Sequence, residues 1–174
     1  MKILSGHLSG NRKLFYLFAY FIATFILVTI IHETGHFVAA LALGVPFNQI
    51  KIIFISGNPG LLLPESFNNS PVVYQYAGGF SAAAVLLIIY FLIWFRRYRK
   101  ESTWYIWGFG CITFLCFGEE VGNGIVEGHF HAAYIYYINY MFSPTNILII
   151  IFAIVGVILH FAFFQLPRVK TKNA

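Results

Sequence analysis

The chain has 174 residues, of which 59% are hydrophobic, and its mean hydropathy is +0.76. It contains six Glu and no Asp, and eleven Lys and Arg give it a formal net charge of +5. An ordinary soluble domain is excluded, because several apolar stretches are long enough to cross a hydrocarbon core of about 30 Å, which takes about 20 residues. The cations gather at the ends of these stretches, which indicates membrane topology and argues against nucleic acid as a partner.

The sequence predicts an all-α membrane protein with about four transmembrane helices and a small β-like segment between the first two. A polar arm over residues 1–13 leads into a single transmembrane domain over residues 14–166. A basic tail over residues 167–174 follows it. The predicted spans cover residues 14–43, 73–95, 103–125 and 146–164.

Two stretches between the spans differ from the helices in composition. Residues 47–57 are β-prone and partly alternating, which predicts a strand or hairpin arm against the helices. Residues 57–71 are rich in Gly, Pro and Asn, which predicts a loop. Residues 118–131 hold four Gly, three Glu and two His, so the third span either ends near Phe117 or continues past Glu119 and Glu120 to about Ile125.

Ten of the eleven cations form three clusters at the ends of apolar stretches: Lys2, Arg12 and Lys13; Arg96, Arg97, Arg99 and Lys100; Arg168, Lys170 and Lys172. The positive-inside rule places all three clusters, and therefore both termini, in the cytoplasm. With four crossings, the far ends of the first and third spans then lie on the same side. This topology predicts that His32 and Glu120 face the same side of the membrane.

The first span contains the sequence Ile31-His32-Glu33-Thr34-Gly35-His36, a His-Glu-x-x-His pattern. On a helix, residues four apart lie on one face, so both His side chains can bind one metal ion. Glu33 lies about 100° round the helix and can reach a metal-bound water. Charged and imidazole side chains are disfavoured inside a membrane without a partner, and a divalent cation would supply the positive charge that this helix interior lacks.

Catalytic zinc has three protein ligands and one open position, so two imidazoles leave one ligand to be found. The available side chains are Glu119, Glu120, Asn123, Glu127, His129 and His131. A carboxylate at the end of the third span is preferred, with Glu120 ahead of Glu119. We expect His129 and His131 to be solvated in a Gly-flanked loop, and His160 to have a packing role.

The chain resembles the intramembrane metalloproteases of the site-2 protease class. The resemblance rests on His32-Glu33-Thr34-Gly35-His36, the β-like segment after it, a span that opens with Gly78-Gly79, and a third span with an acidic end. It covers roughly residues 14 to 127. It implies a zinc-dependent endopeptidase that cuts a transmembrane protein substrate, with Glu33 as the catalytic residue, and it gives Gly78, Gly79 and Asn123 a part in positioning the substrate.

Three features depart from the family pattern. The third ligand of the family is an Asp in an Asp-Gly pair, and this chain has no Asp. Asn123-Gly124 occupies a comparable place, but a neutral amide is a poor zinc ligand, so either Glu119 or Glu120 replaces the Asp or the site is incomplete. The Gly-Pro-x-x-Asn signature of the family is reduced to Gly78-Gly79, which is equally explained by helix packing. Family members generally place the metal toward the cytosol, whereas the positive-inside rule places it toward the outer face here.

The resulting hypothesis is a zinc endopeptidase that acts in or near a transmembrane segment of its substrate. One alternative is a degenerate homologue that binds metal or a partner helix without cleavage. Another is a metal transporter or sensor that uses the acidic and imidazole side chains of residues 119–131. A last alternative places the His and Glu side chains of the motif at the aqueous mouth of an overlong helix.

Overall fold

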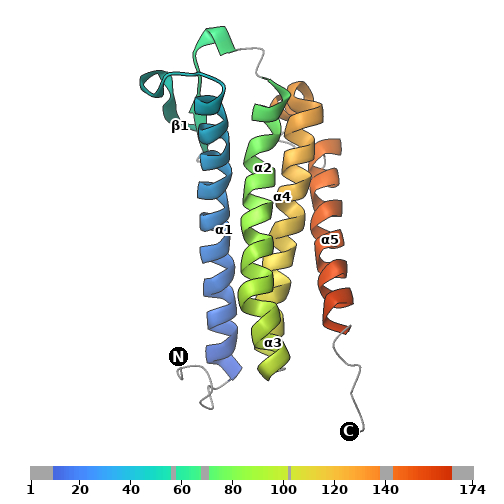
Figure 1. The fold of residues 1–174 in the computed structure, drawn as a ribbon. Helices are drawn as coiled ribbons and strands as arrows, with labels where there is room; N and C mark the ends of the chain where they lie inside the picture. The colour runs from blue at the N-terminus through green and yellow to red at the C-terminus, as the bar shows by residue number, and fades with distance from the viewer. Residues whose placement is uncertain (1–9, 56–57, 68–70, 102, 138–142, 166–174) are drawn as a thin grey trace, which may run out of the picture.

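The computed structural model describes residues 10–55, 58–67, 71–101, 103–137 and 143–165. It contains four long helices (Figure 1), α1 Gly10–Ala42, α2 Val72–Ile89, α4 Trp104–Tyr137 and α5 Pro144–Gln165. Helix α2 continues through a π-helical segment, Tyr90–Phe95, into the short basic helix α3, Arg96–Glu101. The helical class predicted from the sequence is confirmed.

Within the described parts of the chain, four helical segments are long and apolar enough to cross a membrane: Gly10–Ala42, Val72–Lys100, Trp104–His129 and Pro144–Phe163. The chain is therefore a multi-pass membrane protein, and these described segments match the predicted four spans. Helix α1 begins at Gly10, so Asn11, Arg12 and Lys13 are helical and not part of a polar arm. The rest of that arm and the basic tail lie outside the described residues.

Helix α4 is longer than the predicted third span and extends to Tyr137. The alternative in which the third span ends near Phe117 is excluded, and the Gly-flanked loop expected at His129 and His131 is wrong, because residues 118–131 are helical throughout. In an apolar environment each backbone N–H and C=O must be bonded within the chain, which favours helix even where Gly is frequent. The glycines of this stretch serve helix packing instead.

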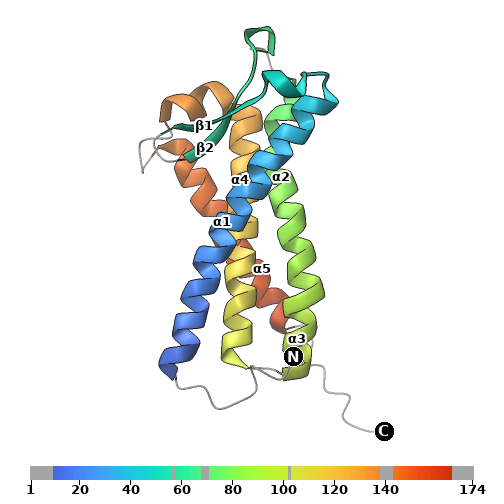
Figure 2. The same cartoon turned by 90° about the vertical axis from the view of Figure 1, so that its left-hand side faces the viewer.

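Helix α4 is the central element of the bundle. Within its most apolar window 56% of the residues are buried, against 11% for the windows of α1 and of α5. Helices α1 and α4 run in the same direction, with α2 and α5 antiparallel to them (Figures 1 and 2). The end of α4 therefore lies near the end of α1, as the topology argument predicts.

Glycines let α4 and α5 approach backbone to backbone. A Cβ added at Gly118 would lie 2.2 Å from the carbonyl oxygen of Phe152, and one added at Gly156 would lie 2.2 Å from that of Phe114. Small residues are the usual means of close helix association in membranes, where apolar surface alone gives no preference for a neighbouring helix over lipid. These contacts hold α5 against the face of α4 that carries Gly118.

Aromatic side chains fill the half of the bundle that contains α3. The Tyr20 hydroxyl lies 2.7 Å from Oγ1 of Thr113 and accepts a hydrogen bond of 2.7 Å from Nε1 of Trp94. His160 is fully buried there, and its Nδ1 lies 3.2 Å from the Tyr90 hydroxyl. Its environment agrees with the predicted packing role, far from the motif of α1.

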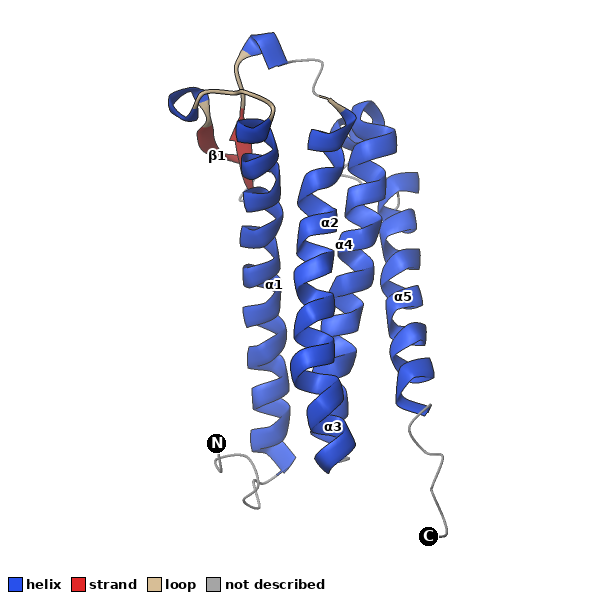
Figure 3. Ribbon diagram, viewed as in Figure 1, coloured by secondary structure: helices blue, strands red, loops and turns tan. Residues whose placement is uncertain are grey.

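A β-hairpin follows α1 (Figure 3), as predicted for residues 47–57. Helix α1 ends at Ala42, and Gly44, whose φ of +89° favours glycine, lies in the turn that follows. Strand β1, Lys51–Ile55, pairs antiparallel with β2, Asn58–Leu62. Strand β2 falls within the stretch predicted to be a loop, which is a correction. The hairpin lies beside the upper part of α1 (Figure 2), and strand β2 contacts that helix.

The α4–α5 contact generates the first prediction. Gly118→Ala forces a methyl group onto the Phe152 carbonyl, and overpacking of this kind costs about 1–3 kcal/mol. We expect a clear fall in the midpoint of thermal unfolding in detergent. Gly10→Ala is the matched control, because nothing lies within 4 Å of a Cβ at Gly10. Equal midpoints for the two variants would contradict the close approach.

Candidate metal centre

Two imidazoles of α1 and two carboxylates of α4 form a cluster inside the bundle. His32 and His36 are 8% and 9% exposed, and Glu120 and Glu127 are 5% and 9% exposed. The residues are spaced by four along α1 and by seven along α4, so each pair occupies one face of its helix. The cluster arises because these two faces meet.

The distances within the cluster fit a bound metal ion. Nε2 of His32 lies 3.2 Å from Nε2 of His36, and the Glu127 carboxylate oxygens lie 3.1 Å and 3.3 Å from these two nitrogens. Ligand atoms about 2.0–2.1 Å from a tetrahedral zinc ion are about 3.3 Å apart. The three side chains therefore already have the mutual spacing of three zinc ligands, and together they form the possible metal-holding group of the described residues.

The Nδ1 atom of each imidazole, which points away from the other imidazole, donates a hydrogen bond. Nδ1 of His36 donates to the backbone carbonyl of Tyr74 at 2.9 Å, and Nδ1 of His32 donates to the Glu120 carboxylate at 2.7 Å. A hydrogen on each Nδ1 leaves a lone pair on each Nε2, which is the tautomer that binds metal. Asn123 donates to the other Glu120 oxygen at 3.3 Å and fixes that carboxylate in turn.

Gly78 of α2 leaves space beside the two Nε2 atoms. A Cβ at this position would lie 2.3 Å from Nε2 of His36 and 2.6 Å from Nε2 of His32. Any larger residue would push against the imidazoles from the side of α2. The absence of a side chain at Gly78 is therefore needed for the arrangement of the cluster, and this supports its fit to a metal ion.

The charge of the cluster also favours a cation. Glu33 is half-buried and directly follows His32 in α1. Helix α1 has no Lys or Arg after Lys13, and neither α2 nor α4 has any. Buried carboxylates without organic counter-ions are costly, and a divalent cation would offset their charge.

The structure brings His32, His36 and Glu33 to one place, as the motif predicts, and gives Glu127 the position expected of Glu120 or Glu119. The Glu120 carboxylate contacts Nδ1 of His32, on the opposite side of the imidazole from the Nε2 atom that would bind metal. Glu119 lies outside the group of possible ligands among the described residues. Glu127 lies about two turns beyond Glu120 in α4, so its carboxylate reaches Nε2 of His32 while that of Glu120 reaches Nδ1.

The remaining predicted positions divide between packing and support. Gly79 faces α4, where an added Cβ would lie 2.4 Å from the backbone nitrogen of Gly124, so it serves helix approach. Asn123 acts on Glu120, as described above. His129 is exposed and lies against the Tyr76 hydroxyl, and His131 belongs to helical backbone and not to a loop.

A signal for Glu127 was present in the sequence. Glu127 is followed by Gly128, and it lies seven residues after Glu120, on the same face of a helix. The glycine has a physical role here, because a Cβ at Gly128 would lie 2.3 Å from the ring of Tyr76. The predicted ligand, Glu120 or Glu119, lies about two turns earlier in the same helix.

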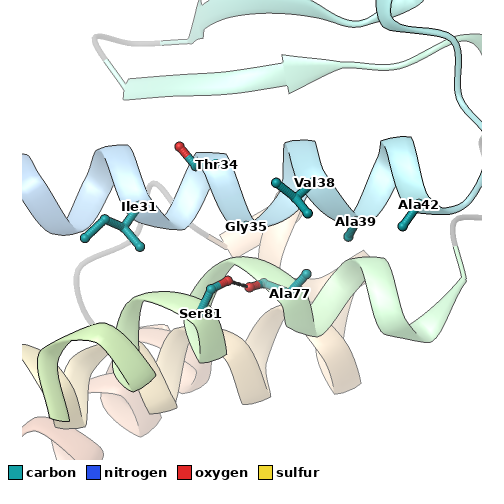
Figure 4. A pocket seen from close by; sticks show the side chains of 8 residues that line it. All are labelled: Ile31, Thr34, Gly35, Val38, Ala39, Ala42, Ala77 and Ser81. Carbon is teal, nitrogen blue, oxygen red and sulfur yellow. Dashed lines mark hydrogen bonds between the residues drawn. The ribbon is translucent and has the colours of Figure 1, made fainter. Parts of the chain in front are cut away.

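An apolar groove lies beside the cluster but outside it (Figure 4), lined by Ile31, Thr34, Gly35, Val38, Ala39 and Ala42 of α1 and by Ala77 and Ser81 of α2. The Ser81 hydroxyl donates to the carbonyl of Ala77, and the Thr34 hydroxyl donates to that of Ile30. The polar groups of the groove are thus satisfied within their own helices. It offers no ligand to the metal-holding group.

Comparison of the chain with protein-family models, with curated proteins and with solved structures found no match.

The geometry separates the carboxylates of α4 by role. Glu127→Gln is expected to abolish stoichiometric zinc binding, because it removes a ligand charge. Glu120→Gln is expected to weaken it by about 10–100-fold, as loss of a supporting carboxylate does. Glu119→Gln, the matched control, should retain wild-type zinc. The measurement is the zinc content and affinity of the purified variants in detergent, and a larger loss with Glu120→Gln than with Glu127→Gln would reverse the assignment.

Gly78→Ala tests the space beside the imidazoles. Ala is favoured over Gly in a helix interior by about 1 kcal/mol, so the substitution should not weaken α2 itself. The added methyl displaces both Nε2 atoms, and we expect zinc affinity to fall at least tenfold while the helical circular dichroism is unchanged. Wild-type affinity in this variant would show that the imidazoles lie elsewhere.

Proposed function

We propose that the chain is a zinc-dependent intramembrane endopeptidase that hydrolyses a peptide bond in or near a transmembrane segment of a membrane-protein substrate. The observation that carries this proposal is the mutual spacing of 3.1–3.3 Å among His32, His36 and Glu127, with Glu33 next to His32 in α1. A His-Glu-x-x-His helix with a third carboxylate is the ligand set of zinc hydrolases.

In this proposal His32, His36 and Glu127 hold the zinc ion, and Glu120 and the Tyr74 carbonyl keep the two imidazoles in the binding tautomer. When bound, zinc lowers the pKa of a water molecule toward about 7 and polarises a carbonyl group. Glu33 accepts one proton from the attacking water as general base. It then delivers that proton to the leaving nitrogen as the C–N bond breaks, so one water is consumed and an acid and an amine are released.

Cleavage within a membrane requires that the substrate helix unwinds, because a helix hides its carbonyls in its own hydrogen bonds. An unwound substrate segment could bind to the β-hairpin as an added strand, on an edge of the two-stranded sheet. The hairpin side chains Ile52 and Phe54 are 71% and 74% exposed, which suits contact with an apolar partner. Membrane lipid is the other expected neighbour of these side chains.

The absence of Asp is the main argument for a homologue that binds metal without cleavage. In our proposal Glu127 supplies the carboxylate ligand in place of an Asp, which weakens that argument. For topology we retain the proposal that both termini are cytoplasmic, on the strength of the basic side chains at the start of α1 and in α3. The cluster would then lie toward the opposite face.

The test of the proposed function is zinc content and proteolysis in the wild type and in Glu33→Gln, purified in detergent. Fluorescein-labelled casein, which needs no unwinding, and a single-span membrane protein are the substrates. We expect stoichiometric zinc in both proteins and a fall in kcat of about 10²–10⁴-fold in the variant, the usual contribution of a general base. Glu65→Gln is the matched control, since Glu65 is exposed and lies outside the four spans.

Each other outcome selects a different function. Wild-type protein without zinc would overturn the proposal at the metal site. Stoichiometric zinc without cleavage of either substrate would favour the metal-binding homologue. Zinc uptake into vesicles that contain the protein, without proteolysis, would favour a transporter.

A further inference from the structure

We propose that Glu119 of α4 is an interaction site for another membrane protein, and that its carboxylate pairs with a Lys or Arg side chain in a transmembrane helix of that protein. The inference goes beyond the proposed function and does not depend on it. It begins from the carboxylate of α4 that takes part neither in the metal-holding group nor in the hydrogen bonds around that group.

Glu119 lies deep within the membrane-spanning part of α4. The segment that is long and apolar enough to cross a membrane runs from Trp104 to His129, and Glu119 lies close to its middle. The side chain is half-buried, and none of the ion pairs or hydrogen bonds among the described residues involves its carboxylate. An ionisable side chain at this depth is costly without a partner and usually marks a functional site.

The helical phase of Glu119 differs from that of every helix contact along this part of α4. Glu120 faces α1, Gly124 faces α2 and Gly122 faces α5. At about 100° per residue, Glu119 lies about 100° from Glu120 and about 140° from Gly124. It lies about 60° from Gly122, in the opposite rotational sense from Glu120. Its side chain therefore leaves α4 between α1 and α5, on the side away from α2.

The described helices leave this side of α4 uncovered. Among the elements that the structure describes, those that pack along α4 are α1, α2 with its continuation, and α5. Helices α1 and α5 flank α4 on opposite sides (Figures 1 and 2), and α2 packs on a third side. The side that carries Glu119 is the fourth, so a helix of another protein has access to its carboxylate from the membrane.

The partner has to supply a cation at the depth of Glu119. Lipid does not supply it, because charged headgroups lie outside the hydrocarbon core. A second copy of this chain does not supply it either, because α1, α2, α4 and α5 contain Lys or Arg only in the first turn of α1. A Lys or Arg in a transmembrane helix of a different protein needs an anionic partner for the same reason that Glu119 needs a cation, so pairing the two removes both costs.

The test measures the association of the purified protein with a synthetic transmembrane helix in lipid vesicles, by energy transfer between fluorophores on the two partners. The probe is a polyleucine helix with one Lys at its centre, and the reference helices have Leu or Glu at that position. We expect wild type to bind the Lys helix about tenfold more tightly than the Leu helix, as an interhelical polar contact in a membrane allows. In Glu119→Gln the affinities for these two helices should differ less than threefold.

Glu65→Gln is the matched control, because it removes an exposed carboxylate outside the four spans and should keep the preference for the Lys helix. Glu119→Gln should keep wild-type zinc, which shows that its fold is intact. Glu119→Lys exchanges the charge, and we expect this variant to prefer the Glu helix.

Three results would overturn the proposal. Equal affinity of wild type for the Lys and Leu helices would leave Glu119 as a carboxyl group that faces lipid. A preference for the Lys helix that persists in Glu119→Gln would assign recognition of the cation to another group. Loss of zinc in Glu119→Gln would assign this carboxylate to the metal centre. The binding measurement needs no proteolysis, so a failure of the proposed function is distinguished from a failure of this inference.

Discussion

The structure depends on contacts between buried polar side chains of α1 and α4, which take the place of the water that these groups would otherwise bind. An apolar bundle gives His32, Glu120 and Glu127 no water to bond with, so each must find its partner in the protein. Nδ1 of His32 donates to the Glu120 carboxylate at 2.7 Å, and its Nε2 lies 3.1 Å from the Glu127 carboxylate, so these contacts join α1 to α4 across 88 and 95 residues of chain. They also fix how α1 and α4 are rotated about their axes, because the side chains that make them occupy one face of each helix.

Glycine makes this compensation geometrically possible. Gly79 brings α2 onto the backbone of α4, and Gly78 accommodates the two imidazoles. On the other side of α4, Gly118 and Gly156 bring α5 equally close. The helix that bears the carboxylates is thus held from two sides by contacts that tolerate no added methyl group, which confines Glu120 and Glu127 to a narrow range of positions.

Much of this arrangement followed from the sequence. Segment length and hydropathy predicted four spans, and the spacing of His32 and His36 predicted one shared face. The third ligand did not follow, because the choice between Glu120 and Glu127 depends on where α4 ends. In a soluble protein a glycine-rich sequence indicates a loop, whereas in an apolar bundle it indicates close contact between helices. For this reason the sequence did not predict that the helix continues to Glu127 and brings it to the same face as Glu120. Strand β2 was missed for a similar reason, since Pro59 and Gly60 signal a turn when they are considered alone.

The long separation of the clustered residues along the chain has a consequence for biosynthesis. The ribosome completes α1, with His32, Glu33 and His36, before it reaches the residues of α4 that neutralise them. At a synthesis rate of about 5–20 residues per second, roughly 5–20 seconds pass before Glu120 and Glu127 emerge. During that interval α1 must stay in the bilayer with two imidazoles and a carboxylate still without their partners. Its entry therefore relies on the long apolar stretch before the motif, and completion of the site is a late event in the assembly of the protein.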